Sequence, residues 1–135
     1  MKELQAEYGE QVEFLMVYIN EAHALDSAMP LGGRGGAPLV EEPRTYEERQ
    51  TVAQTCAGAL DMAPIRMLVD GIDNRVGTAY AAWPDRLYLV GLDGKLAYAG
   101  KQGPFGFSPN ELEDAIRVQL ELEPRKRTKP ERSPR

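Results

Sequence analysis

The fold is decided by the stretch Trp83-Pro-Asp-Arg-Leu-Tyr-Leu-Val-Gly-Leu-Asp-Gly-Lys-Leu-Ala-Tyr-Ala-Gly100. Two largely apolar runs, 86–92 and 95–100, flank an Asp-Gly pair at positions 93 and 94, which is the strongest short-range signal for a β-hairpin. The sequence therefore predicts two antiparallel strands joined by a tight turn. A proline stands shortly before the first of them.

The residues after the hairpin predict a helix. Ser108 is typical of the cap position, Pro109 of the first helical position and Glu111 of a capping box. One face of this helix carries an apolar stripe, which predicts burial against the core. Its members are Leu112, Ala115, Ile116 and Leu120.

Upstream of the hairpin, helical and strand patterns alternate. The predicted elements are a helix end at 2–9, a strand at 12–19, a helix at 45–60, a strand at 65–69 and a short helix at 76–82. The strand 12–19 is continuously apolar, which predicts burial on both faces in a parallel sheet. Thr45 and Glu48 form a capping box at the start of the long helix. Its expected buried stripe is Val52, Ala53, Cys56 and Leu60.

Residues 24–44 form a long predicted loop, which in a compact domain is either functional or mobile. It contains Gly32-Gly-Arg-Gly-Gly36. These glycines are only a weak signal for a phosphate-binding loop, because no GxxxxGK[ST] pattern follows and no strand leads into them.

The order of elements predicts an α/β fold. A parallel βα part followed by a hairpin and a closing helix predicts a three-layer α/β/α sandwich. The proline ahead of the hairpin makes this the second half of a thioredoxin-like domain. We expect residues 1–123 to form that domain and residues 124–135 to be a disordered basic tail, because this segment is rich in proline and charge.

Composition excludes several classes of protein. A chain of 135 residues with one cysteine and one histidine cannot hold a disulfide framework or a zinc ribbon, and we expect no metal site. The longest wholly apolar run, 14–19, is too short to span a bilayer, and the first ten residues show no secretory signal. We therefore expect a cytoplasmic protein without a membrane partner.

The charge is unevenly distributed. Residues 124–135 hold six of the 16 basic residues and one of the 21 acidic residues, which leaves 10 basic against 20 acidic residues in the rest of the chain. An acidic body repels a phosphate backbone, so we expect no nucleic-acid partner.

Two residues after the first strand are candidates for chemistry. Glu21 and His23 lie two apart and follow the carboxyl end of a parallel strand, where open α/β sheets place their ligand sites. A carboxylate beside an imidazole can relay a proton. The alternative is a loop histidine bonded to nearby backbone. Cys56, the only thiol, falls on the apolar stripe, so we expect an inert core residue.

Four stretches together resemble the iodothyronine deiodinases and their bacterial relatives. They are Phe14-Leu-Met-Val-Tyr-Ile-Asn-Glu-Ala-His23, Thr45-Tyr-Glu-Glu-Arg49, Tyr80-Ala-Ala-Trp-Pro-Asp-Arg-Leu-Tyr88 and Gly94-Lys-Leu-Ala-Tyr-Ala-Gly-Lys-Gln-Gly-Pro104. The family consists of thioredoxin-fold enzymes that remove iodine reductively from phenolic hormones, with a cysteine or selenocysteine nucleophile and an external thiol reductant. The resemblance implies these properties here, with no bound cofactor and a possible homodimer.

The resemblance also assigns roles to residues. It implies that Glu21 and His23 bind substrate or transfer a proton, and that Pro84 is a cis proline in the substrate-binding region, together with Arg86. Phe105 and Phe107 either line a pocket for a phenolic ring or cover the end of the core. Arg49 and Tyr80 recur in the matching stretches, and for them ion-pair or packing roles are expected.

In the family, the nucleophile segment and the central strand come before the helix in which this chain begins. We therefore expect that the chain is a truncated reading of a longer gene, that it lacks the nucleophile and the central strand, and that it is inactive by itself. Two alternatives stay open. One is a peroxiredoxin-like thiol or peroxide reductase, and the other is a non-catalytic binding module.

Overall fold

The computed structural model describes residues 1–28, 30 and 38–127 of the chain. The chain folds as two compact units. The first consists of Met1–Arg86 and Lys101–Phe107, and the second of Leu87–Gly100 and Ser108–Arg135.

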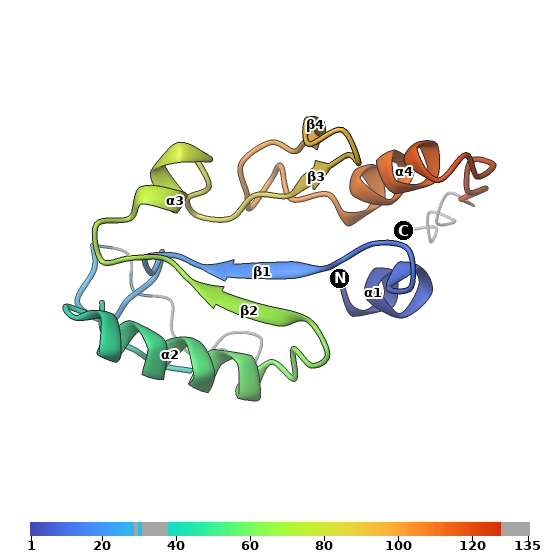
Figure 1. The fold of residues 1–135 in the computed structure, drawn as a ribbon. Coiled ribbons are helices and arrows are strands. Elements are labelled where there is room, and N and C mark those ends of the chain that lie inside the picture. The colour runs from blue at the N-terminus through green and yellow to red at the C-terminus, as the bar shows by residue number, and fades with distance from the viewer. Residues whose placement is uncertain (29, 31–37, 128–135) are drawn as a thin grey trace, which may run out of the picture. The chain divides into compact units, whose positions relative to one another are not determined.

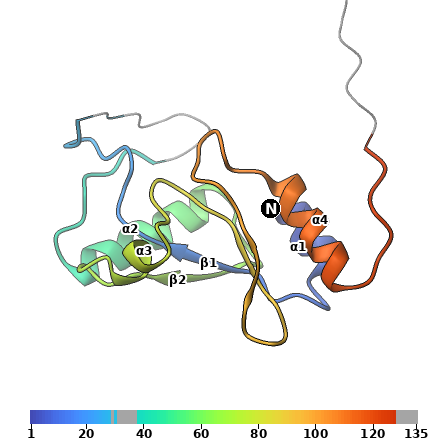
Figure 2. The same cartoon turned by 90° about the horizontal axis from the view of Figure 1, so that it is seen from above.

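The first unit contains a parallel strand pair and three helices (Figure 1). Its elements are α1 (Lys2–Tyr8), β1 (Leu15–Tyr18), α2 (Tyr46–Ala59), β2 (Arg66–Val69) and α3 (Arg75–Ala79). β1 and β2 pair in parallel from Leu15↔Arg66 to Tyr18↔Val69. Both strands are shorter than predicted. α2 packs against β2, and both views show it along one side of the strand pair (Figure 2).

The two faces of this strand pair differ in burial. Along each strand, exposed residues alternate with half-buried ones. Leu15, Val17 and Leu68 share the exposed face. The prediction that strand 12–19 is buried on both faces was therefore wrong. An apolar run reports hydrophobicity, and it does not by itself establish how many layers cover the strand.

Helix α2 begins as its sequence predicts. The Thr45 hydroxyl accepts a hydrogen bond from the Glu48 N–H, and the Glu48 carboxylate accepts one from the Thr45 N–H. The buried stripe was only partly predicted: Ala53 is buried, Cys56 is half-buried and Leu60 is exposed. The charged side chain of Arg49 is buried in addition.

The second unit consists of the predicted hairpin and the last helix. β3 (Tyr88–Val90) and β4 (Leu96–Ala99) pair antiparallel, and α4 (Pro109–Gln119) packs against both. Gly94 has a φ of +77°, a value that favours glycine at this turn. The buried core of the second unit consists of Leu89, Leu112 and Ile116. The register shifts between Leu89 and Val90, and both strands are shorter than predicted.

The cap of α4 differs in one detail from the prediction. Ser108 accepts from the Glu111 N–H and Pro109 occupies the first turn, as expected. The Glu111 carboxylate, predicted to complete a capping box, instead accepts a hydrogen bond from the Tyr98 hydroxyl at 3.2 Å. A cross-element partner has here replaced the local backbone one.

The long loop is joined at its base. The Leu25 N–H donates to the Val40 carbonyl at 2.8 Å, and the Glu42 N–H donates to Asp26 Oδ1 at 2.9 Å. These bonds hold the two ends of the predicted loop 24–44 together. The glycine run at 32–36 lies outside the described residues.

The prediction of a mixed α/β fold is confirmed, with the described strands arranged as two sheets of two strands each. Within the described ranges, the helices are all too short or too polar to cross a membrane. Of the predicted tail, residues 124–127 are described and 128–135 are not. Arg125 and Arg127 form ion pairs with Glu113 on α4 at 2.9 Å.

Candidate functional site

The candidate site lies where β1 and β2 end. Asp70, the first residue after β2, is buried, and its backbone N–H donates to the Tyr18 carbonyl at the end of β1. Its carboxylate accepts from the N–H groups of Val76 and Gly77, at 3.1 and 2.8 Å, which fixes the start of α3. Polar residues after both strands are thereby held together at one edge of the sheet, the usual position of ligand sites in parallel sheets.

Arg49 connects the segments that follow the two strands. Its side chain is buried, and one terminal nitrogen, Nη1, donates to the Gly71 carbonyl at 2.8 Å and to Asn74 Oδ1 at 2.7 Å. The other, Nη2, pairs with Glu42 Oε1 at 3.1 Å. The second oxygen of Glu42 accepts from the Glu21 N–H at 2.8 Å. The expected ion-pair role of Arg49 is confirmed.

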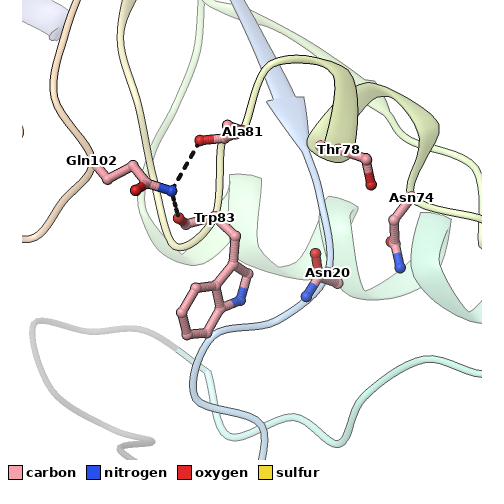
Figure 3. Close-up of a pocket in the computed structure, with 7 residues that line it drawn as sticks. Asn20, Asn74, Thr78, Ala81, Trp83 and Gln102 are labelled. Atoms are coloured by element: carbon pink, nitrogen blue, oxygen red, sulfur yellow. Dashed lines mark hydrogen bonds between the residues drawn. The ribbon is translucent and has the colours of Figure 1, made fainter.

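A pocket of about 300 Å³ opens at this edge (Figure 3). It is lined by Asn20, Asn74, Gly77, Thr78, Ala81, Trp83 and Gln102. The described lining combines an indole with amide and hydroxyl groups, and none of these seven side chains carries a charge. Such a surface can stack on an aromatic ring and hydrogen-bond to neutral polar groups.

The pocket wall around Trp83 is held by side chains that contact backbone carbonyls. Gln102 Nε2 donates to the Ala81 carbonyl at 3.1 Å and to the Trp83 carbonyl at 2.8 Å (Figure 3). Arg86 donates to the carbonyls of Tyr80 and Ala81 at 3.4 Å. The Trp83–Pro84 peptide bond is cis, which confirms the prediction for this proline.

Glu21 and His23 interact electrostatically. Burial raises the pKa of the Glu21 carboxyl above its ordinary value, and the negative charge of Glu42 raises it further. The charges of His23 and Arg49 act in the opposite direction. The Tyr18 hydroxyl donates to the Glu21 carboxylate, while His23 is exposed. A carboxyl and an imidazole that interact in this way are groups that can transfer protons.

Cys56 lies in α2 and is half-buried. Burial raises the pKa of its thiol, and the negative charge of Glu21 raises it further. The thiolate, which is the reactive form, is therefore disfavoured. This agrees with the expected inert role, although the side chain is less buried than its stripe predicted.

The site residues predicted from the sequence do not all lie at the pocket. Glu21 and His23 do not belong to the pocket lining, although Asn20, next to Glu21, does. Arg86 contacts the backbone of the pocket wall, and Phe105 is fully exposed. In the part of the chain that the structure describes, no cluster of three or more histidine, cysteine, aspartate or glutamate residues could hold a metal.

Sequence reasoning missed most of the pocket lining. Asn74 could have been found, because it follows the second strand and the carboxyl ends of parallel strands meet at one edge. Gln102 lies in the turn after the hairpin, and no local pattern marks it. Glu42 is also unmarked, since its role depends on a partner in another element.

Comparison with known proteins places the chain in a family. A family model described as iodothyronine deiodinase matches residues 1–121. The type I iodothyronine deiodinase of Xenopus laevis is 31% identical over 106 residues, which are 78% of this chain and 39% of that protein. The type II enzyme of Homo sapiens is 31% identical over 112 residues, 82% of this chain and 41% of that protein.

Thyroxine 5-deiodinase of Sparus aurata is 33% identical over 108 residues, which are 79% of this chain and 38% of that protein. The chain thus spans about two fifths of the length of the curated relatives it matches.

Proposed function

Because the chain belongs to the iodothyronine deiodinase family, we propose that it contributes substrate binding and proton transfer to the reductive removal of iodine from an iodinated phenol. The observation that carries this proposal is the family match over residues 1–121. The pocket beside Trp83 supports it, since an aromatic wall with neutral polar groups suits a phenolic ring.

The proposed reaction consumes one iodinated ring and two thiols. The carbon–iodine bond breaks, a carbon–hydrogen bond forms, iodide and a proton leave, and the two thiols are oxidised to a disulfide. The reductant is an external thiol. In this scheme Glu21 and His23 deliver the proton to the ring carbon, and Trp83 stacks on the substrate.

The nucleophile of this reaction is assigned to none of the 135 residues. The one thiol in the sequence, Cys56, has a raised pKa and is absent from the described pocket lining. We therefore propose that this chain alone binds substrate and does not turn it over.

The fold that we propose is the thioredoxin-like three-layer α/β/α sandwich. Two features support it: the parallel pair β1–β2 with its connecting helix α2, and the hairpin followed by α4. The sequence predicts the same order of elements, a parallel βα part followed by a hairpin and a closing helix, for such a sandwich.

Binding is tested through Trp83, the only tryptophan of the chain. Thyroxine is titrated into the purified protein, and fluorescence quenching by the iodine atoms is followed. We expect saturable quenching at one site, weakened in Asn74→Ala and unchanged in Val118→Ala, an exposed residue on α4. Quenching no stronger than that of free N-acetyltryptophanamide would overturn the binding proposal.

Turnover is tested by measuring iodide release in the presence of dithiothreitol. We expect none from this chain. Iodide release that disappears in Cys56→Ser would show that the nucleophile lies within the 135 residues after all.

The alternative of a non-catalytic binding module is separated by mass spectrometry of the native protein from its source cells. Peptides that precede Met1 and contain cysteine or selenocysteine would support the enzyme. A mature N-terminus at Met1 or Lys2 would support the binding module.

A further inference from the structure

We propose that Arg49 is a positioning residue for the site, acting on Glu21 through Glu42 and on the pocket wall through Asn74. The inference rests on the proposed function in taking Glu21 as the proton-transfer group. Its geometric part, that one buried guanidinium holds both segments in place, is independent of any substrate.

The burial of Arg49 makes its contacts costly to lose. Only 2% of its side chain is exposed, although it carries a full charge. A buried cation without partners loses its hydration without compensation, so the contacts to Gly71, Asn74 and Glu42 are strongly favoured. The segments that provide these contacts are consequently held to the helix that carries Arg49.

The first branch of this network leads to Glu21. Arg49 Nη2 contacts one oxygen of Glu42, and the other oxygen accepts from the Glu21 N–H. Glu42 can bridge in this way only while its carboxylate is oriented, and the guanidinium supplies that orientation from a rigid helix. The position of the Glu21 backbone, and with it the Glu21 carboxyl, therefore depends on Arg49.

The second branch leads to the pocket wall. Asn74 lines the pocket, and its side-chain oxygen accepts from Arg49 Nη1 at 2.7 Å. The residue has a φ of +53° and caps α3 without a side-chain hydrogen bond to that helix. The hydrogen bond from Arg49 therefore fixes the orientation of the Asn74 side chain at the pocket wall.

The geometry requires arginine in particular. Its planar fork reaches two segments from two nitrogens, which the single ammonium of lysine cannot reproduce. Nε is buried and has no hydrogen-bond partner among the described residues. An unpaired buried polar atom costs free energy and needs an explanation. Here the other two nitrogens of the same guanidinium make the contacts that hold the site.

The test measures Glu21 directly by NMR, on the full chain and without substrate. Amide hydrogen exchange at Glu21 reports whether its N–H is held, and carboxyl resonances give its pKa. The groups that act on this carboxyl are Tyr18, His23, Glu42, Arg49 and Cys56. The variants are Arg49→Lys, Arg49→Met and Glu42→Gln, with Arg66→Met as control, since Arg66 pairs with Glu13 on the surface.

A positioning role gives a distinct pattern. We expect about tenfold faster exchange at the Glu21 amide in Arg49→Lys, as expected for loss of one oriented hydrogen bond to a charged group. The pKa of Glu21 should rise in Arg49→Met and fall in Glu42→Gln, two changes of opposite sign that general loosening would not produce. Arg66→Met should change neither.

Unchanged exchange and an unchanged Glu21 pKa in folded variants would overturn the proposal. If the Arg49 variants do not fold, Glu42→Gln decides, because it keeps the contacts of Arg49 to Gly71 and Asn74 and removes only the negative charge of the bridging side chain. Thyroxine titration through Trp83 keeps the two proposals apart. Changes at Glu21 without thyroxine binding to the wild type would contradict the proposed function and leave the positioning role of Arg49 standing.

Discussion

Each unit contains an ion pair with one buried member, and the buried charge has the opposite sign in the two units. In the first, the cation Arg49 is 2% exposed and its ionic partner Glu42 is 35% exposed. In the second, the anion Glu113 is 4% exposed and its cationic partners Arg125 and Arg127 are 43% and 32% exposed. In both units the buried charge sits on a helix and its partners lie in irregular segments.

The difference between the two lies in what the irregular segments do. The partners of Arg49 belong to the segments that follow β1 and β2, and these build the pocket wall. The partners of Glu113 belong to the segment after α4, which contacts the surface of that helix. In both units a buried charge therefore holds a segment that has no regular secondary structure. What this does for the protein depends on the residues in that segment.

The largest expected effect comes from Arg49→Met. The substitution removes the hydrogen-bond donor of the Gly71 carbonyl, the Asn74 amide oxygen and the Glu42 carboxylate, so the free energy of unfolding should fall by about 3 kcal/mol. Urea denaturation followed by circular dichroism measures this. A smaller loss of stability than that caused by the double substitution Arg125→Ala with Arg127→Ala would contradict the comparison between the two units.

The double substitution Arg125→Ala with Arg127→Ala should cost less. Hydrogen bonds to Asp114 and Glu113 raise the pKa of Arg127, but the guanidinium remains in contact with water, and salt screens such pairs. We expect a smaller loss of stability than for Arg49→Met, and one that shrinks between 0.05 and about 1 M salt. The same urea titration at two salt concentrations checks it, with a salt-independent loss as the contrary outcome.

Backbone conformation provides a finer comparison. Gly94 in the hairpin has a φ of +77°, and an added Cβ there meets no atom within 4 Å. Gly94→Ala should therefore reveal the backbone cost alone, a loss of about 1 kcal/mol. Thermal unfolding measures it. An unchanged midpoint would show that the turn relaxes to another conformation.

The smallest effect is expected in the pocket wall. Ala81 has a φ of +46°, a conformation that glycine adopts more easily. Ala81→Gly should raise stability by about 0.5 kcal/mol, the difference between the relieved strain and the added chain entropy. The same thermal unfolding assay checks it, together with thyroxine titration. A decrease in stability would mean that the Ala81 methyl group is needed for packing.

Local signals predicted the elements of this fold well. The capping box at Thr45, the cap at Ser108 and the Asp-Gly turn at 93 and 94 all act within a few residues, so the sequence shows both partners. Burial was harder to predict. Whether Leu15 or Leu60 is covered depends on how many layers pack around the strand or helix, which is a property of the whole chain.

The site was predicted only in part, because local sequence signals mark some of its residues and not others. Glu21 follows a strand end, which is a local signal, and its electrostatic interaction with His23 is present in the structure. The network around Arg49 joins residues 7, 22 and 25 positions apart in sequence. No spacing rule covers those distances, so Arg49 could be recognised as an ion-pair candidate but not as the link between two segments.

The base of the long loop has a practical consequence. The hydrogen bonds from Leu25 to Val40 and from Glu42 to Asp26 join the two ends of the loop. Glu42, at the second of these ends, contacts Arg49 and Glu21. Because doubling the length of a closed loop adds only about 0.6 kcal/mol of entropy, peptide inserted beyond these bonds should leave Glu42 in place. A change in the length of the segment between these bonds should therefore leave the contacts of Glu42 with Arg49 and Glu21 intact.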